Sequence, residues 1–148
     1  MSETFQARVE TCRSGTNPAL ICPLPSGWVV LCDMQFLRGY CILLADPVVA
    51  DLNALNQQQR ARFLCDMALV GDALLEVTGA YRINYAIMGN SDPFLHTHIV
   101  PRYMHEPEEL RKGLPWSYPK DVINARPSDP QSDQDLIRKI ALAIQARQ

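Results

Sequence analysis

Residues 84–102 read NYAIMGNSDPFLHTHIVPR and contain two strand-like runs separated by a turn-forming GNSDP segment. Apolar and aromatic residues on either side of such a turn predict two strands, over residues 81–88 and 94–100. Side chains alternate across a strand, so His96 and His98 project from one face, roughly 6–7 Å apart along it. Two of the chain's three histidines therefore share one strand face.

The paired imidazoles favour nucleophilic chemistry at phosphorus. A neutral imidazole, with a reference pKa near 6.5, offers a lone pair that can attack phosphorus and leave a histidine–phosphate bond for water to break. A second histidine can donate to the leaving group or hold a phosphate oxygen. Asn90 and Ser91, in the turn before the strand, add backbone and side-chain donors that suit a transferring phosphoryl group.

This segment resembles the signature segment of the histidine-triad (HIT) superfamily, in which three alternating histidines precede two apolar residues and often Pro-Arg. The resemblance spans roughly residues 27–103 and includes the Asn-x-x-x-x-Gly-Asn stretch and a strand–helix–strand order. Within the superfamily, the chain is similar to the dinucleoside polyphosphate hydrolase-like proteins. It implies a hydrolase or transferase of nucleotide phosphoesters, phosphoanhydrides or phosphoramidates that acts through a nucleotidyl-histidine intermediate.

The resemblance also implies roles for individual residues. His96 takes the place of the nucleophile, and His98 that of the last triad histidine. Polar residues around them take the places that bind phosphate and ribose in the family, and Arg102 could reach a phosphate. The predicted substrate-binding residues are Asn84, Asn90, Ser91, Asp33 and Arg102.

Two positions depart from the family pattern. Phe94 stands where the first triad histidine belongs, and Val48 stands where a further histidine often precedes the long helix. In the family the first-position residue also orients the nucleophile through its backbone carbonyl, which Phe94 still supplies. The missing imidazole lowers the expected rate, because general acid–base help is typically worth about 10²–10⁴-fold. A nucleotide-binding module with weak or no turnover is therefore the alternative function.

A metal-dependent hydrolase is the other alternative. His96 and His98 on one strand face, together with His105, offer the three imidazoles of a zinc site. However, His105 follows Pro101, which is expected to end the strand, and no glutamate or cysteine has a convincing ligand spacing. We therefore predict neither a metal nor a cofactor.

The clearest helix is predicted over residues 57–78. Asn56 is a good N-cap with Gln59 at capping-box spacing, and Gly79 provides the C-terminal stop. Apolar residues recur every three or four positions and line one face. They are Phe63, Met67, Val70, Leu74 and Val77.

Shorter elements surround this helix. Residues 3–13 predict a short amphipathic helix, residues 19–22 a strand ended by Pro23, and residues 27–32 and 40–44 two antiparallel strands. Strands that precede and follow one long helix favour an α+β fold with a mainly antiparallel sheet of about five strands. With the resemblance, this is a HIT-like sheet with one long helix and a C-terminal helix.

The C-terminal third is expected to differ in character. Six of the eleven prolines lie in residues 101–130, which predicts an extended arm. Ser132 is expected to cap a last helix over residues 133–146. Within the arm, Trp116 and Tyr118 are large groups expected to pack on the domain or on a second subunit.

Length and composition indicate one globular domain. We expect a single HIT-like domain over residues 1–148, with a core of about 19–103 and the arm and last helix over 104–148.

A net charge of −2 argues against broad electrostatic binding of nucleic acid. No signal-peptide pattern and no membrane span of ~20 apolar residues are seen. Five cysteines without Cys-x-x-Cys spacing favour a reduced, cytoplasmic protein. The resemblance implies a homodimer and a nucleotide-type substrate.

Overall fold

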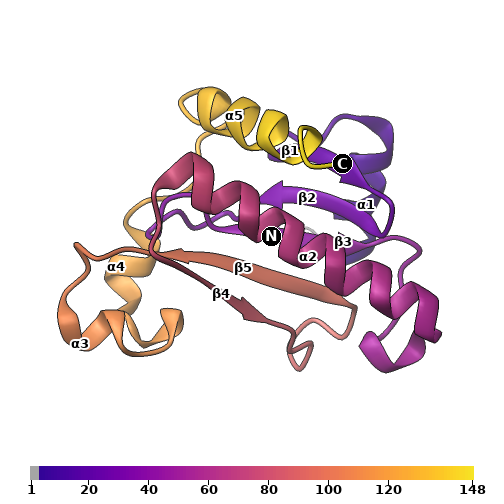
Figure 1. Cartoon of the computed structure of the whole chain (residues 1–148), viewed down its shortest axis with the longest axis horizontal. Helices are drawn as coiled ribbons and strands as arrows, with labels where there is room; N and C mark the ends of the chain where they lie inside the picture. Colours follow the sequence, from indigo (N-terminus) through magenta and orange to yellow (C-terminus); the bar gives the residue numbers. More distant parts are fainter. Residues whose placement is uncertain (1–3) are drawn as a thin grey trace.

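Residues 4–148, the part of the chain that this computed structural model describes, contain a five-stranded antiparallel sheet (Figure 1). Its strands lie in the order β1-β2-β3-β5-β4, and every neighbouring pair is antiparallel. The predicted α+β class with an antiparallel sheet is confirmed. The strands are β1 (Leu20–Leu24), β2 (Gly27–Leu31), β3 (Cys41–Ala45), β4 (Arg82–Ala86) and β5 (His96–Arg102).

Helices cover both faces of this sheet. The long helix α2 (Gln57–Thr78) and the later helix α5 (Gln134–Gln145) pack together over one face (Figure 1). Helix α1 (Phe5–Ser14) packs on the opposite face, where its buried side chains join a second apolar cluster. The remaining short elements are η1 (Leu52–Ala54), α3 (Glu108–Arg111), η2 (Pro115–Ser117) and α4 (Lys120–Asn124).

The alternation of side chains along the strands divides the interior into two apolar clusters. In β5, Thr97 and Ile99 face α2, and the Thr97 hydroxyl lies 3.2 Å from the Met67 sulfur. His96, His98 and Val100 consequently point to the other face, toward α1. Fully burying one large apolar side chain contributes about 1.5–3 kcal/mol, so both clusters stabilise the fold substantially.

Helix α2 confirms the prediction made from its caps and its period. It spans the predicted residues, begins with the Asn56–Gln59 capping box and ends at Gly79, whose φ of 72° is left-handed. Gly71 faces the sheet, where the Tyr85 hydroxyl of β4 lies so close that an added Cβ would be 1.9 Å from it. This glycine therefore allows β4 to approach the helix.

Two strands continue through prolines that we expected to end them. β1 runs through Pro23 and pairs only with β2, so it is an edge strand, where proline is tolerated. β5 runs through Pro101, but β3 begins opposite Ile99, so Pro101 lies beyond that ladder. The sheet order, which the sequence does not reveal, decides both cases.

The two terminal helices also differ in detail from the predictions. The first begins at Phe5, whereas residue 3 of the predicted range lies outside the described residues. Helix α5 takes Asp133, not Ser132, as its N-cap residue, and no side chain caps it. The Asp133 carboxylate instead accepts hydrogen bonds from Arg38 and from the backbone N–H of Asp129.

The arm is not extended, as we had expected, but folds into the short elements α3, η2 and α4. Tyr118 within it is buried in the same cluster as α1, and α5 contributes to the other cluster. The interior therefore draws on residues well outside the predicted core of 19–103. None of the helices within residues 4–148 has the length and apolar character of a membrane span.

Candidate active site on strand β5

His96 and His98 lie side by side at the start of β5, between β3 and β4. Their ring centroids are 5.1 Å apart and the rings meet nearly edge to face. Both side chains are half-buried. The structure thus places the two histidines on one face of the strand, as the alternation predicted.

The His96 ring is oriented by the backbone of Phe94. Its Nδ1 lies 2.7 Å from the Phe94 carbonyl oxygen, which can only accept a hydrogen bond. The Nδ1 atom therefore carries the proton, and in the neutral ring Nε2 keeps its lone pair. This is the arrangement that an attacking imidazole needs, and it confirms the orienting contact expected of the Phe94 carbonyl.

His98 is held by Tyr40 at the entrance to β3. The Tyr40 hydroxyl lies 2.6 Å from His98 Nδ1, and burial raises the pKa of Tyr40, so this hydroxyl stays protonated at neutral pH. Burial, followed by the charge that His96 can carry, lowers the pKa of His98 to about 4. His98 is therefore a neutral hydrogen-bonding group at pH 7 and not an imidazolium.

This lowered pKa predicts a loss of stability in acid. An unfolded histidine titrates near pH 6.5, so between about pH 6.5 and 4 the unfolded chain binds a proton that the folded chain excludes. The contribution of His98 to the free energy of unfolding is fully present above this window and is lost as the pH falls through it. From His98 alone we expect a loss of about 2–3 kcal/mol between about pH 6.5 and about pH 4.5.

Urea unfolding of the wild type and of His98→Gln at both pH values checks this expectation. The variant should lose correspondingly less stability on acidification, because it lacks the His98 imidazole. The carboxyl groups whose pKa values are also lowered, Asp46, Glu106 and Asp135, contribute equally to both proteins. An identical loss in the two proteins would contradict the assignment.

Aromatic rings enclose the two histidines on both sides. On the His96 side, Phe94 stacks on Phe5 of α1 at 5.2 Å, and the Phe5 ring is 5.8 Å from that of His96. On the His98 side, Trp116 of η2 meets the imidazole edge to face at 5.3 Å. Val48, the second position that departs from the family pattern, packs against the same apolar cluster. Apolar side chains thus occupy both positions at which the family resemblance led us to expect histidines.

Comparison with solved structures finds the fold of this chain in histidine-triad proteins. One from Bradyrhizobium japonicum has a TM-score of 0.68 at 24% identity, over 84% of this chain and 89% of its own. A hypothetical histidine triad nucleotide-binding protein from Sulfolobus tokodaii has a TM-score of 0.70 at 13% identity, over 93% and 91%. The chain has the histidine-triad fold. A Zn-bound histidine triad family protein from Mycobacterium smegmatis matches with a TM-score of 0.67 at 19% identity, over 97% and 99%.

Searches with the whole sequence do not find this likeness. No family profile matches the chain, and no curated protein matches it. The evidence for the histidine-triad fold is therefore the match in three dimensions, together with the short motif around His96.

The turn between β4 and β5 carries two of the predicted ligand residues. Asn90 and Ser91 are exposed there, immediately after Gly89, whose φ of 87° gives the turn its left-handed step. The turn closes on the strand through a hydrogen bond from the Phe94 N–H to the Asp92 carbonyl. Their donors are thus accessible to a ligand at the start of β5.

Asp33 and Asn84, two further predicted ligand residues, have protein partners. Asp33 follows β2, is exposed, and forms a 3.4 Å ion pair with Arg8 of α1. The Asn84 side chain of β4 accepts a hydrogen bond from Arg102. Asn84 therefore belongs to a structural network, whereas Asp33 keeps an exposed carboxylate.

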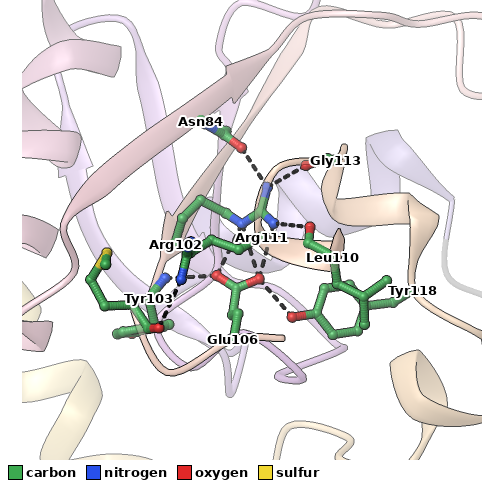
Figure 2. A network of polar contacts seen from close by, with 9 residues as sticks. Asn84, Arg102, Tyr103, Glu106, Leu110, Arg111, Gly113 and Tyr118 are labelled. Atoms are coloured by element: carbon green, nitrogen blue, oxygen red, sulfur yellow. Dashed lines mark hydrogen bonds and ion pairs between the residues drawn. The ribbon is translucent and has the colours of Figure 1, made fainter. Parts of the chain in front are cut away.

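Arg102 does not face a ligand, which corrects the prediction that it reaches a phosphate. Its side chain is only 1% exposed, and its guanidinium pairs with Glu106 in a buried ion pair (Figure 2). The other donors of the guanidinium reach the Asn84 side chain and the carbonyl oxygens of Leu110 and Gly113. All its hydrogen-bonding capacity is used within the protein.

The histidines are not arranged as a zinc site. His105 stacks on Tyr103 at 5.0 Å in the arm and is exposed to solvent. Within residues 4–148, no group of three histidine, cysteine, aspartate or glutamate side chains is placed to hold a metal ion. The triad that we considered for metal binding is thus not assembled here.

Tyr40, Phe5 and Trp116 are the site residues that sequence reasoning missed or left without a role. Alternation along residues 40–44 already places Tyr40 on one face with Ile42. The contact follows from the pairing of Ile42 with His98 between β3 and β5. That pairing depends on the tertiary structure and cannot be predicted from the local sequence. Phe5 and Trp116 reach the site through the packing of α1 and the arm, and no local pattern signals either contact.

Proposed function

We propose that this chain is a histidine-triad nucleotide hydrolase or transferase in which His96 attacks phosphorus. The observation that carries the proposal is the 2.7 Å contact between His96 Nδ1 and the Phe94 carbonyl oxygen. It fixes the tautomer in which Nε2 presents its lone pair away from the backbone. The nucleotide-binding description of the Sulfolobus tokodaii protein supports the same substrate class.

The reaction then has two steps. His96 Nε2 forms a bond to the nucleotide phosphorus, and the bond between phosphorus and the leaving group breaks. Water or another acceptor next attacks phosphorus, gives up a proton, and releases the nucleotidyl group from the histidine. The neutral His98 donates a hydrogen bond through Nε2–H when Tyr40 donates to its Nδ1.

Substrate contacts are assigned to the residues that remain accessible around β5. Asn90 and Ser91 offer donors for the phosphate oxygens, and Asp33 offers a carboxylate for the ribose hydroxyls. The aromatic pair of Phe5 and Phe94 gives an apolar wall beside His96. No disulfide joins the cysteines within residues 4–148, which suits a reducing compartment such as the cytoplasm.

A nucleotide-binding module with little turnover is the second candidate function. Phe94 supports it, because the first triad position offers a phenyl ring and no imidazole. Such a protein would bind nucleotide through the same residues. Only measured turnover separates it from the enzyme.

Turnover of a substrate panel tests the proposal. We would incubate the protein with dinucleoside polyphosphates, nucleoside phosphoramidates and nucleotide sugars, with and without a strong chelator, and follow release of nucleoside monophosphate. Release that survives the chelator is expected. Nucleotide binding without release would favour the binding module, and activity abolished by the chelator would favour a metal-dependent enzyme.

Restoring the first triad imidazole should raise turnover. Phe94→His places a third imidazole on the strand face of His96 and His98, where it can protonate a leaving group. We expect an increase of about 10²-fold for phosphoramidates, whose amine must leave protonated, and a smaller one for phosphoanhydrides. Steady-state kinetics on both classes measures this, with nucleotide affinity little changed.

Phe94→Tyr is the matched control, since it keeps the ring that stacks on Phe5 and adds no imidazole. If a well-folded Phe94→His protein turns over no faster than Phe94→Tyr, Phe94 does not limit the rate.

A homodimer with a continuous sheet is expected. β4 is an edge strand, and the large apolar side chains Tyr81, Tyr85 and Met88 on and beside it are exposed, as is Leu75 on α2. A second copy would cover this surface. Sedimentation velocity should give the mass of two chains for the wild type and one for Tyr81→Glu/Met88→Glu. A monomeric wild type at micromolar concentration would exclude the dimer.

A further inference from the structure

The arm that follows β5 is fixed to the sheet by the Arg102–Glu106 ion pair (Figure 2). Glu106 accepts from the guanidinium, from the Tyr103 N–H and from the Tyr118 hydroxyl. Burial alone would raise the pKa of Glu106, but hydrogen bonds from Arg102, Tyr118 and the Tyr103 backbone outweigh it and lower the pKa. The carboxylate is therefore charged at neutral pH, and the pair is complete.

The same network pins the chain on both sides of Trp116. Three residues before it, the Gly113 carbonyl accepts from Arg102 Nη1 at 2.9 Å. Two residues after it, the Tyr118 hydroxyl donates to Glu106 at 2.6 Å. The short helix η2 between these anchors carries the Trp116 ring to within 5.3 Å of His98.

Trp116 contacts His98 and also lines a cavity beside it. A cavity of about 500 Å³ lies between β4 and the arm, and the Trp116 side chain forms part of its wall, along with Ala86 and Val100. Ala86 is the β4 partner of His98 in the sheet. Without the indole, water in this cavity would reach the imidazole.

We propose that Arg102 and Glu106 are positioning residues, which act through Trp116 to limit the water around His98 and to hold its ring in its working orientation. The inference rests on the proposed function, in which His98 donates to the substrate. Tyr40 fixes Nδ1 of His98, His96 lies beside its ring, and Trp116 closes the third side. The arm is thus part of the site although none of its residues lies in the histidine motif.

NMR titration of the His98 imidazole tests the proposal without any substrate. His98→Gln identifies the resonance. In the wild type we expect protonation near the low value of about 4, and in Trp116→Ala and in Arg102→Lys a rise toward ~6.5, because water enters. The Trp116→Ala/Arg102→Lys double variant should show no further rise, since both changes act through one contact.

Controls come from the same arm. Met104 is 63% exposed, and the Arg111 guanidinium donates a hydrogen bond to the Met104 carbonyl at the surface, so Met104→Ala and Arg111→Lys should leave the His98 titration unchanged. If Arg102→Lys does not fold, Tyr118→Phe replaces it, with a smaller rise expected. A His98 pKa that stays low in Trp116→Ala, or in both network variants, overturns the proposal.

Kinetics adds a second readout when turnover is present. Trp116→Ala and Arg102→Lys should lower kcat by about tenfold or more, with KM changing far less, because substrate binding is assigned to other residues. A rise in KM at constant kcat would overturn the positioning role. If the protein has no turnover at all, the proposed function fails, whereas the titration still decides whether the arm controls His98.

Discussion

Replacing His96 with alanine is expected to abolish the nucleotidyl adduct and to lower turnover by at least about 10³-fold. The reason is that, in the proposed reaction, His96 Nε2 forms the new bond to phosphorus in the first step. Nucleotide affinity should change little, because the donors of Asn90 and Ser91 and the aromatic wall remain. The adduct can be trapped with a slowly hydrolysed substrate and located by mass spectrometry.

Variants of the other two histidines provide comparisons for His96→Ala. His98→Ala should cost less, about 10²-fold, because it removes a supporting donor and not the attacking atom. His105→Ala should have no effect, since that exposed ring stacks on Tyr103 in the arm. Label on a residue other than His96, or wild-type turnover in His96→Ala, would show that His96 is not the nucleophile.

Arg102→Met should lower the free energy of unfolding by about 3–5 kcal/mol. The substitution leaves the Glu106 carboxylate buried without its cation and removes the donors to the Leu110 and Gly113 carbonyl oxygens. Urea unfolding at neutral pH measures the loss directly. Arg138→Met is the matched control, because the Arg138 pair with Asp135 is largely exposed and contributes little.

The double variant Arg102→Met/Glu106→Leu separates the two contributions. Removing both charges eliminates the cost of an unpaired buried carboxylate, so part of the stability should return. The backbone carbonyl oxygens remain without their donor, at a cost of about 1–3 kcal/mol each unless water reaches them. Full recovery of wild-type stability would show that these carbonyl bonds contribute nothing.

The features that the sequence predicted correctly depend on short-range patterns. The bounds of helix α2 could be predicted because the signals that set them, the N-cap, the apolar period and the terminal glycine, all lie within residues 56–79. The shared face of His96 and His98 follows from strand alternation. The contact between His96 and the Phe94 carbonyl spans only two residues.

The features that the sequence did not predict depend on distant partners. Arg102 was expected at a phosphate because a cation after a histidine strand suits an anion. Its actual partners, such as Glu106 and the Gly113 carbonyl, come into place only when the arm folds. Likewise, the strands continue through Pro23 and Pro101 because of the sheet order, which no local pattern contains.

The rings that surround the histidines come from widely separated positions, and a ribosome releases them in order. Phe5 and Tyr40 emerge well before β5, whereas Trp116 follows it, and the apolar side chains of α5 appear later still. At about 5–20 residues per second, residues 103–145 take about 2–9 s to synthesise. Until α5 is made, its side chains cannot complete the apolar cluster on the α2 side of the sheet, and an incompletely covered apolar surface is the kind that chaperones bind.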